Sequence, residues 1–169
     1  MKSILISSAL AVLMLFIQST WLSRGVVLGV IPNLAMSVLL FTSFINKNGH
    51  GIIAAFMTGI VADMLSASPI GYFAFLFSSC AYLTTLTSYV TEKDAVVIPF
   101  LLGAVATIVM GLLSRILLWL FSADIHAYQI FSVEFGVELI MNGLFTTFIF
   151  FLLSFIQPFF EHSPKKALP

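Results

Sequence analysis

Hydrophobic residues occur in six long runs that are separated by short polar connections. The runs cover residues 4–22, 26–45, 49–65, 70–90, 95–121 and 130–160. A bilayer-spanning α-helix needs about 20 predominantly apolar residues. The runs lack the ten-residue alternation of a membrane β-barrel, and lipid cannot satisfy open backbone groups. The pattern predicts an all-α integral membrane protein, a six transmembrane helix bundle in which residues 1–169 form a single domain.

Composition supports this prediction. Of the 169 residues, 60% are hydrophobic and 8% are charged, whereas a soluble domain is about 25% charged. The mean hydropathy is +1.13. The formal net charge is zero and no basic run occurs, which argues against a nucleic-acid partner. The solvent of most side chains is therefore expected to be membrane lipid.

The basic residues predict an orientation, because cytoplasmic loops are enriched in Lys and Arg. With six spans, both ends of the chain lie on one side of the membrane. That side collects Lys2, Lys47, Lys93, Lys165 and Lys166, whereas the loops of the opposite side contain Arg24. Both termini are therefore expected in the cytoplasm.

Charged side chains inside the predicted spans all fall in the outer half. Asp63 lies near the outer end of the third run, and Arg115 lies roughly 9 Å below the outer end of the fifth. Glu134 and Glu138 lie roughly 6 and 12 Å into the sixth run. Charge at membrane depth is costly and by default marks a functional site. Since consecutive helices run antiparallel, we expect Arg115 to pair with Glu134 or Glu138.

Two interpretations of the sixth run stay open. Glu134, Glu138 and Asn142 recur every four residues, so they share one helix face. That face should point into the bundle or at a partner protein. An Arg115–Glu138 pair would lock two helices together, whereas a partner or ligand would use the same charges for binding.

The most distinctive motif joins the third run to the fourth. It reads Gly59-x-x-x-Asp63, followed by Pro69-x-Gly71. Ala55 precedes Gly59 by four residues, and small residues at this spacing let helices approach closely. Asp63 either caps or hydrogen-bonds the turn before Pro69, or it contacts a partner or ligand. A hydrogen-bonding role is expected to survive Asp63→Asn, whereas a charge-dependent contact is not.

Catalytic and metal-binding motifs are missing from the sequence. No H-E-x-x-H, G-x-S-x-G, phosphate-binding glycine loop or metal-ligand cluster occurs. His50, His126 and His162 are far apart in the sequence. We therefore expect neither an enzyme nor a bound cofactor or metal.

Short motifs in three of the runs carry a family resemblance. They are Pro32-Asn33-Leu34, then Gly59-Ile60-Val61-Ala62-Asp63, then Ser68-Pro69-Ile70-Gly71 with Phe73-Ala74. With these motifs the chain resembles the bacterial rod shape-determining protein MreD family, which usually carries Pro-Asp where this chain has Pro32-Asn33. Together with the charged residues, they define the candidate partner- or ligand-binding residues: Pro32, Asn33, Gly59, Asp63, Pro69, Gly71, Arg115, Glu134, Glu138 and Asn142.

The resemblance implies a non-enzymatic scaffold of the cell-wall elongation complex in the inner (cytoplasmic) membrane. Its expected partners are the bitopic protein MreC, the actin-like MreB, the glycosyltransferase RodA and a class B penicillin-binding transpeptidase. It also implies a fold similar to the substrate-binding subunits of energy-coupling-factor transporters. The alternative function is therefore a substrate-binding membrane subunit of a vitamin-type transporter, with its solute in the outer-half polar cluster.

Overall fold

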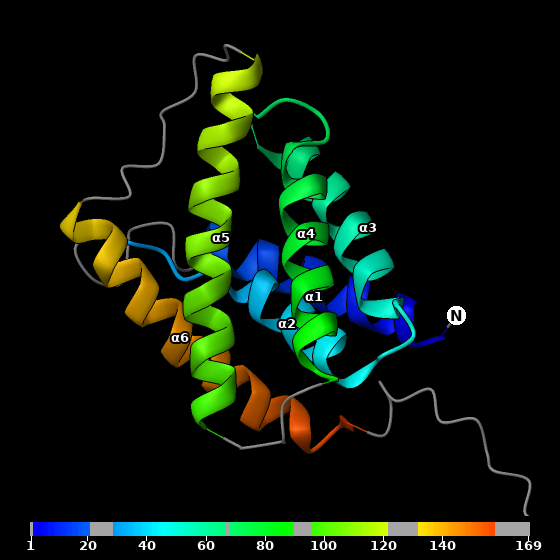
Figure 1. The fold of residues 1–169 in the computed structure, drawn as a ribbon. Helices are drawn as coiled ribbons and strands as arrows, with labels where there is room; N and C mark the ends of the chain where they lie inside the picture. Colours follow the sequence, from blue (N-terminus) through cyan, green and yellow to red (C-terminus); the bar gives the residue numbers. More distant parts are fainter. Residues whose placement is uncertain (1, 21–28, 67, 90–95, 122–131, 158–169) are drawn as a thin grey trace, which may run out of the picture.

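Six α-helices make up the regular structure of the residues that the structure describes. The computed structural model describes residues 2–20, 29–66, 68–89, 96–121 and 132–157. The helices are α1 (Lys2–Thr20), α2 (Leu34–Ile45), α3 (His50–Leu65), α4 (Tyr72–Thr87), α5 (Val97–Phe121) and α6 (Val133–Ser154) (Figure 1). Helices α1, α3, α4 and α5 begin and end within three residues of the predicted runs. The all-helical prediction is confirmed for these residues.

Helix α2 is shorter than its apolar run predicted. The helix begins at Leu34 and has 12 residues, or roughly 18 Å of length. The preceding residues 29–33 are not helical, so the predicted start at residue 26 was wrong. The physical reason is local, because Pro32 has no N–H group to donate and Asn33 adopts a non-helical N-cap conformation with φ −86° and ψ 82°.

Helix α2 forms the centre of the bundle. Every residue from Leu34 to Phe44 is buried, and α2 contacts each of the other five helices. A helix that is apolar on all sides is typical of such a fully enclosed position. Phe41 of α2 packs edge-on against Phe150 of α6, with ring centroids 5.2 Å apart.

The outer helices form two close pairs around α2. Helices α3 and α4 lie side by side, and α6 crosses α5 at a steep angle (Figure 1). Small residues permit both contacts. A Cβ atom on Gly59 of α3 would lie 2.3 Å from the Cα of Ala74 in α4, and one on Gly103 of α5 would lie 2.7 Å from the backbone O of Asn142 in α6.

Three of the described helices are long and apolar enough to cross a membrane. They comprise Ser3–Thr20, Val97–Leu120 and Val133–Ser154, whereas α2, α3 and α4 have 10–17 residues each. The count of six spans therefore stays a prediction. The Tyr89 hydroxyl after α4 donates to the Lys47 carbonyl before α3 (2.8 Å), which places the end of α4 beside the start of α3.

Candidate functional site

Asp63 caps the start of α4 from the end of α3. Its Oδ1 accepts the N–H of Phe73 at 2.7 Å. Its Oδ2 accepts the N–H groups of Gly71 at 2.8 Å and of Ala74 at 3.3 Å. The first N–H groups of a helix have no partner within the helix, and the positive end of the helix dipole favours a carboxylate there. Asp63 is 3% exposed, so its carboxylate is enclosed by the turn it caps.

The other motif residues make this cap possible. Gly71 has φ +97°, a left-handed conformation that favours glycine, and this brings its N–H toward Asp63. The Pro69 carbonyl accepts the N–H of Tyr72 at 3.1 Å. Gly59, one turn before Asp63, allows the backbone of α4 to contact α3. The motif that joins the third and fourth runs thus builds one helical hairpin.

This geometry changes what Asp63→Asn can distinguish. Both carboxylate oxygens accept N–H groups, whereas an asparagine amide has a single oxygen acceptor and an NH₂ donor. Asparagine would therefore direct a donor at another donor. The two-oxygen geometry therefore predicts that asparagine disrupts this cap, contrary to the expectation from the sequence, and that substitution cannot separate a cap from a charge-dependent partner contact.

A second cap lies at the start of α2 and uses amide side chains from two other helices. The Asn33 Oδ1 accepts the Met36 N–H at 3.0 Å. The Gln18 Oε1, near the end of α1, accepts the Leu34 N–H at 3.0 Å. The Asn142 Oδ1, from α6, accepts the Asn33 N–H at 2.7 Å. Non-helical backbone is tolerated at membrane depth where protein encloses and satisfies it, and these three side chains do so.

Asn142 also connects α6 to α5. Its Nδ2 donates to the Thr107 Oγ1 at 3.0 Å, and Thr107 donates to the Gly103 carbonyl at 2.9 Å. Asn142 is 7% exposed and contacts two helices besides its own. One turn further along α6, the Thr146 hydroxyl lies 2.9 Å from that of Ser37 in α2. Part of the predicted polar face of α6 therefore points into the bundle, as expected.

The charged part of that face behaves differently. Glu134 is exposed, Glu138 is half-buried and Arg115 is exposed. Within the described part of the chain, the structure records no ion pair between Arg115 and either glutamate. The predicted Arg115–Glu134 or Arg115–Glu138 pairing was therefore wrong.

The steep crossing of α5 and α6 explains this result. The two helices meet where Gly103 faces Asn142 and Thr146, and where Gly143 faces the Phe100 ring. These contacts lie in the first half of α5, and from there α6 diverges, so its first turns are far from the end of α5 that follows Arg115 (Figure 1). The antiparallel order of α5 and α6 predicted that Arg115 and the two glutamates lie at a similar depth. It did not predict whether their side chains lie on helix faces that contact each other.

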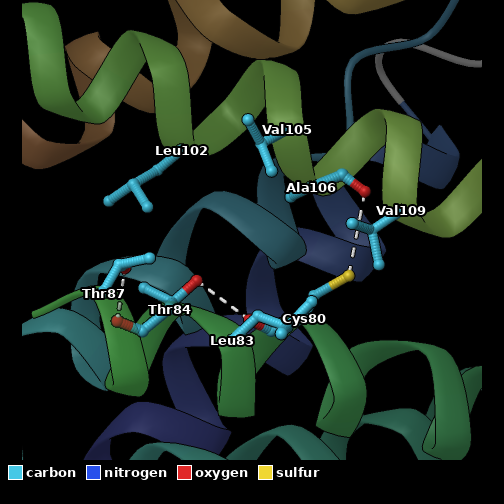
Figure 2. Close-up of a pocket in the computed structure, with 8 residues that line it drawn as sticks. All are labelled: Cys80, Leu83, Thr84, Thr87, Leu102, Val105, Ala106 and Val109. Atoms are coloured by element: carbon cyan, nitrogen blue, oxygen red, sulfur yellow. Dashed lines mark hydrogen bonds between the residues drawn. The ribbon is translucent and has the colours of Figure 1, made fainter.

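The recess between α4 and α5 offers no charged site. Cys80, Leu83, Thr84 and Thr87 line it from α4, and Leu102, Val105, Ala106 and Val109 line it from α5 (Figure 2). Its volume is about 30 Å³, which is the space of one water molecule rather than of a solute. Thr84 and Thr87 donate to backbone carbonyls of α4, both at 2.9 Å, and the Cys80 thiol donates to the Ala106 carbonyl at 3.7 Å.

Sequence reasoning missed several residues of the polar network, among them Gln18 and Thr107. Gln18 and Thr107 each bond a group from another helix. Gln18 was a visible signal, because an amide inside an apolar run usually finds a hydrogen-bond partner in the bundle. Thr107 carried no comparable signal, since threonine in a membrane helix often bonds only its own backbone.

Comparison with protein families decides where the chain belongs. A family model described as rod shape-determining protein MreD matches residues 1–158. The chain belongs to the MreD family. No curated protein and no solved structure matches it. Membership links this MreD-family protein to rod-shape determination, and the caps at α2 and α4 contain the Pro32-Asn33 and Asp63…Gly71 motifs on which the resemblance rests.

Proposed function

We propose that the protein is a non-enzymatic membrane scaffold of the rod-shape complex, that it binds MreC and that it supports peptidoglycan synthesis. The family match over residues 1–158 carries this proposal. In the proposed scaffold, all six helices lie in the inner membrane as a single unit, and both termini lie in the cytoplasm. RodA, a class B penicillin-binding transpeptidase and MreB are the further partners that the resemblance implies.

The use of the polar side chains supports a scaffold. Asp63 and Asn33 hold the first turns of α4 and α2, and Asn142 joins three helices. A scaffold needs a fixed outer shape, and caps that connect separate helices supply it, because each one couples the position of one helix to another. In the transporter alternative, Asp63 was expected to hold a solute together with Arg115, Glu134 and Glu138, and its carboxylate instead accepts N–H groups at the start of α4.

The test is recovery of MreC together with restoration of cell shape. Affinity-tagged protein, expressed with the MreC of the same genome, should retain MreC in mild detergent. In cells depleted of their own MreD-family protein it should restore rods. Phe56→Leu, at an exposed side chain of α3, serves as the control variant and should behave as wild type. A folded protein that retains no MreC, or that leaves depleted cells round, would refute the proposal.

A further inference from the structure

One face of α5 carries a regular row of exposed side chains. The row consists of Leu101, Val105, Ile108, Leu112, Arg115 and Trp119, all of which are exposed. Their spacing is four, three, four, three and four residues. This is the a/d repeat by which one helix packs along another. We call this row the α5 seam.

Arg115 makes the seam different from an ordinary lipid-facing surface. It is exposed and lies one turn before Trp119, which is 83% exposed. Exposed tryptophan is typical of the membrane–water interface. Arg115 then lies roughly 6 Å deeper, toward the hydrocarbon. A guanidinium at that depth is costly unless a counter-ion reaches it or its side chain extends to the headgroups.

The acidic residues that the structure describes do not supply this counter-ion. The oxygens of Asp63 accept the N–H groups of α4, and Glu134 and Glu138 lie on α6 beyond its crossing with α5. A second copy of the chain fits poorly, because among its described residues Glu134 lies in the first turn of α6 and Glu138 is half-buried. Neither offers a fully exposed carboxylate at the depth of Arg115, which lies roughly 9 Å inside the end of α5.

A groove beside the seam adds room for large side chains. It has a volume of about 470 Å³ and lies between α4 and α5. Val109 and Leu113 line it from α5, and Phe75 and Ser79 line it from α4. A helix lying along the seam could place side chains into this groove, as knobs enter holes in helix packing.

We propose that the α5 seam docks the single transmembrane helix of the bitopic partner, and that a carboxylate in the outer part of that helix pairs with Arg115. This inference rests on the proposed function and specifies its contact surface. The guanidinium binds a carboxylate through two parallel hydrogen bonds, a geometry that lysine cannot reproduce. Leu101, Val105, Ile108 and Leu112 supply the apolar part of the contact.

Photo-crosslinking tests the surface with Arg115 intact. A photoreactive residue replaces Leu112 on the seam or, as the matched control, Phe56 on α3. The two side chains are 50% and 52% exposed, and each lies nine residues before the end of its helix. In membranes that contain co-expressed MreC, position 112 should crosslink to the transmembrane helix of MreC and position 56 should not.

Other crosslinking results overturn the inference. They are equal yields from both positions, a yield only from position 56, adducts to lipid alone, and adducts to a second copy of this chain. If wild-type protein recovers MreC and the seam does not crosslink to it, the inference fails and the proposed function stands. If wild-type protein recovers no MreC, both fail.

Charge substitutions test the ion pair. Arg115→Glu should reduce MreC recovery at least tenfold, and exchange of the partner carboxylate for arginine should restore it. Arg115→Lys should recover less MreC than wild type. If the side chain only reaches lipid headgroups, Arg115→Lys and Arg115→Ala will recover MreC as wild type does, which overturns the pairing. The melting temperature of each purified variant identifies any loss caused by unfolding.

Discussion

Replacing Asp63 with asparagine keeps the size of the side chain and removes one hydrogen-bond acceptor. In wild type, Oδ1 accepts the Phe73 N–H, and Oδ2 accepts those of Gly71 and Ala74. The better orientation of the asparagine leaves its oxygen in the Oδ2 position, where two bonds persist. Its NH₂ group then faces the Phe73 N–H, so two donors meet and that amide has no partner.

The expected loss of stability follows from these contacts. An amide left without its partner costs about 1–3 kcal/mol. The two remaining bonds change from a charged to a neutral acceptor, which weakens each by about 0.5–1 kcal/mol. Asp63→Asn should therefore lower the free energy of unfolding by about 3 kcal/mol. Asp63→Ala, which removes all three bonds, should lower it at least as much.

Equilibrium unfolding in mixed detergent–SDS micelles measures this difference. Glu134→Gln is the control, because Glu134 is exposed and surface substitutions usually change stability by less than about 0.5 kcal/mol. If Asp63→Asn unfolds within about 0.5 kcal/mol of wild type, the carboxylate is not acting as a two-oxygen cap and the reasoning is refuted.

Further substitutions test the other contacts by the same unfolding assay. Gly59→Ala should destabilise by about 1–3 kcal/mol, because its Cβ would meet the α4 backbone; Gly136→Ala, with nothing within 4 Å of the new Cβ, should be neutral or stabilising by up to about 1 kcal/mol. Equal effects of the two would contradict the close helix contact. Asn142→Ala should cost about 1–3 kcal/mol by leaving the Asn33 N–H unpaired, and unchanged stability would show that this N–H has another partner. Gly71→Ala should cost about 1–2 kcal/mol of backbone strain, which a wild-type melting temperature would rule out.

The helices were largely predictable because lipid demands long apolar runs with satisfied backbones. The start of α2 was not, although its signals are present in the sequence. Pro32-Asn33 is a recognisable helix start, but the apolar residues 26–31 before it extend the hydrophobic run. Hydrophobicity reports which residues avoid water, and it does not distinguish a helical residue from an extended residue that is enclosed by protein.

Contacts between helices were harder to predict. For Asp63, the sequence suggested that the side chain caps a turn, but it did not identify the groups that the carboxylate would bind. These are N–H groups at the start of the next helix, eight to eleven residues later in the chain. The pairing of Arg115 failed for a different reason. Depth can be read from position along a helix, whereas the crossing angle depends on where small residues such as Gly103 and Gly143 let two helices approach.

Hydrogen exchange at the helix starts tests the central claim most directly, namely that polar side chains of one helix hold the first turn of another. In lipid nanodiscs, the amides of Gly71 and Phe73 should be protected in wild-type protein. In Asp63→Ala they should exchange at least about tenfold faster, the change expected for loss of about 1.4 kcal/mol of local stability, while the amides of Asn33 and Leu34 at the start of α2 keep their protection. Unchanged exchange at Gly71 and Phe73 in Asp63→Ala would contradict the account.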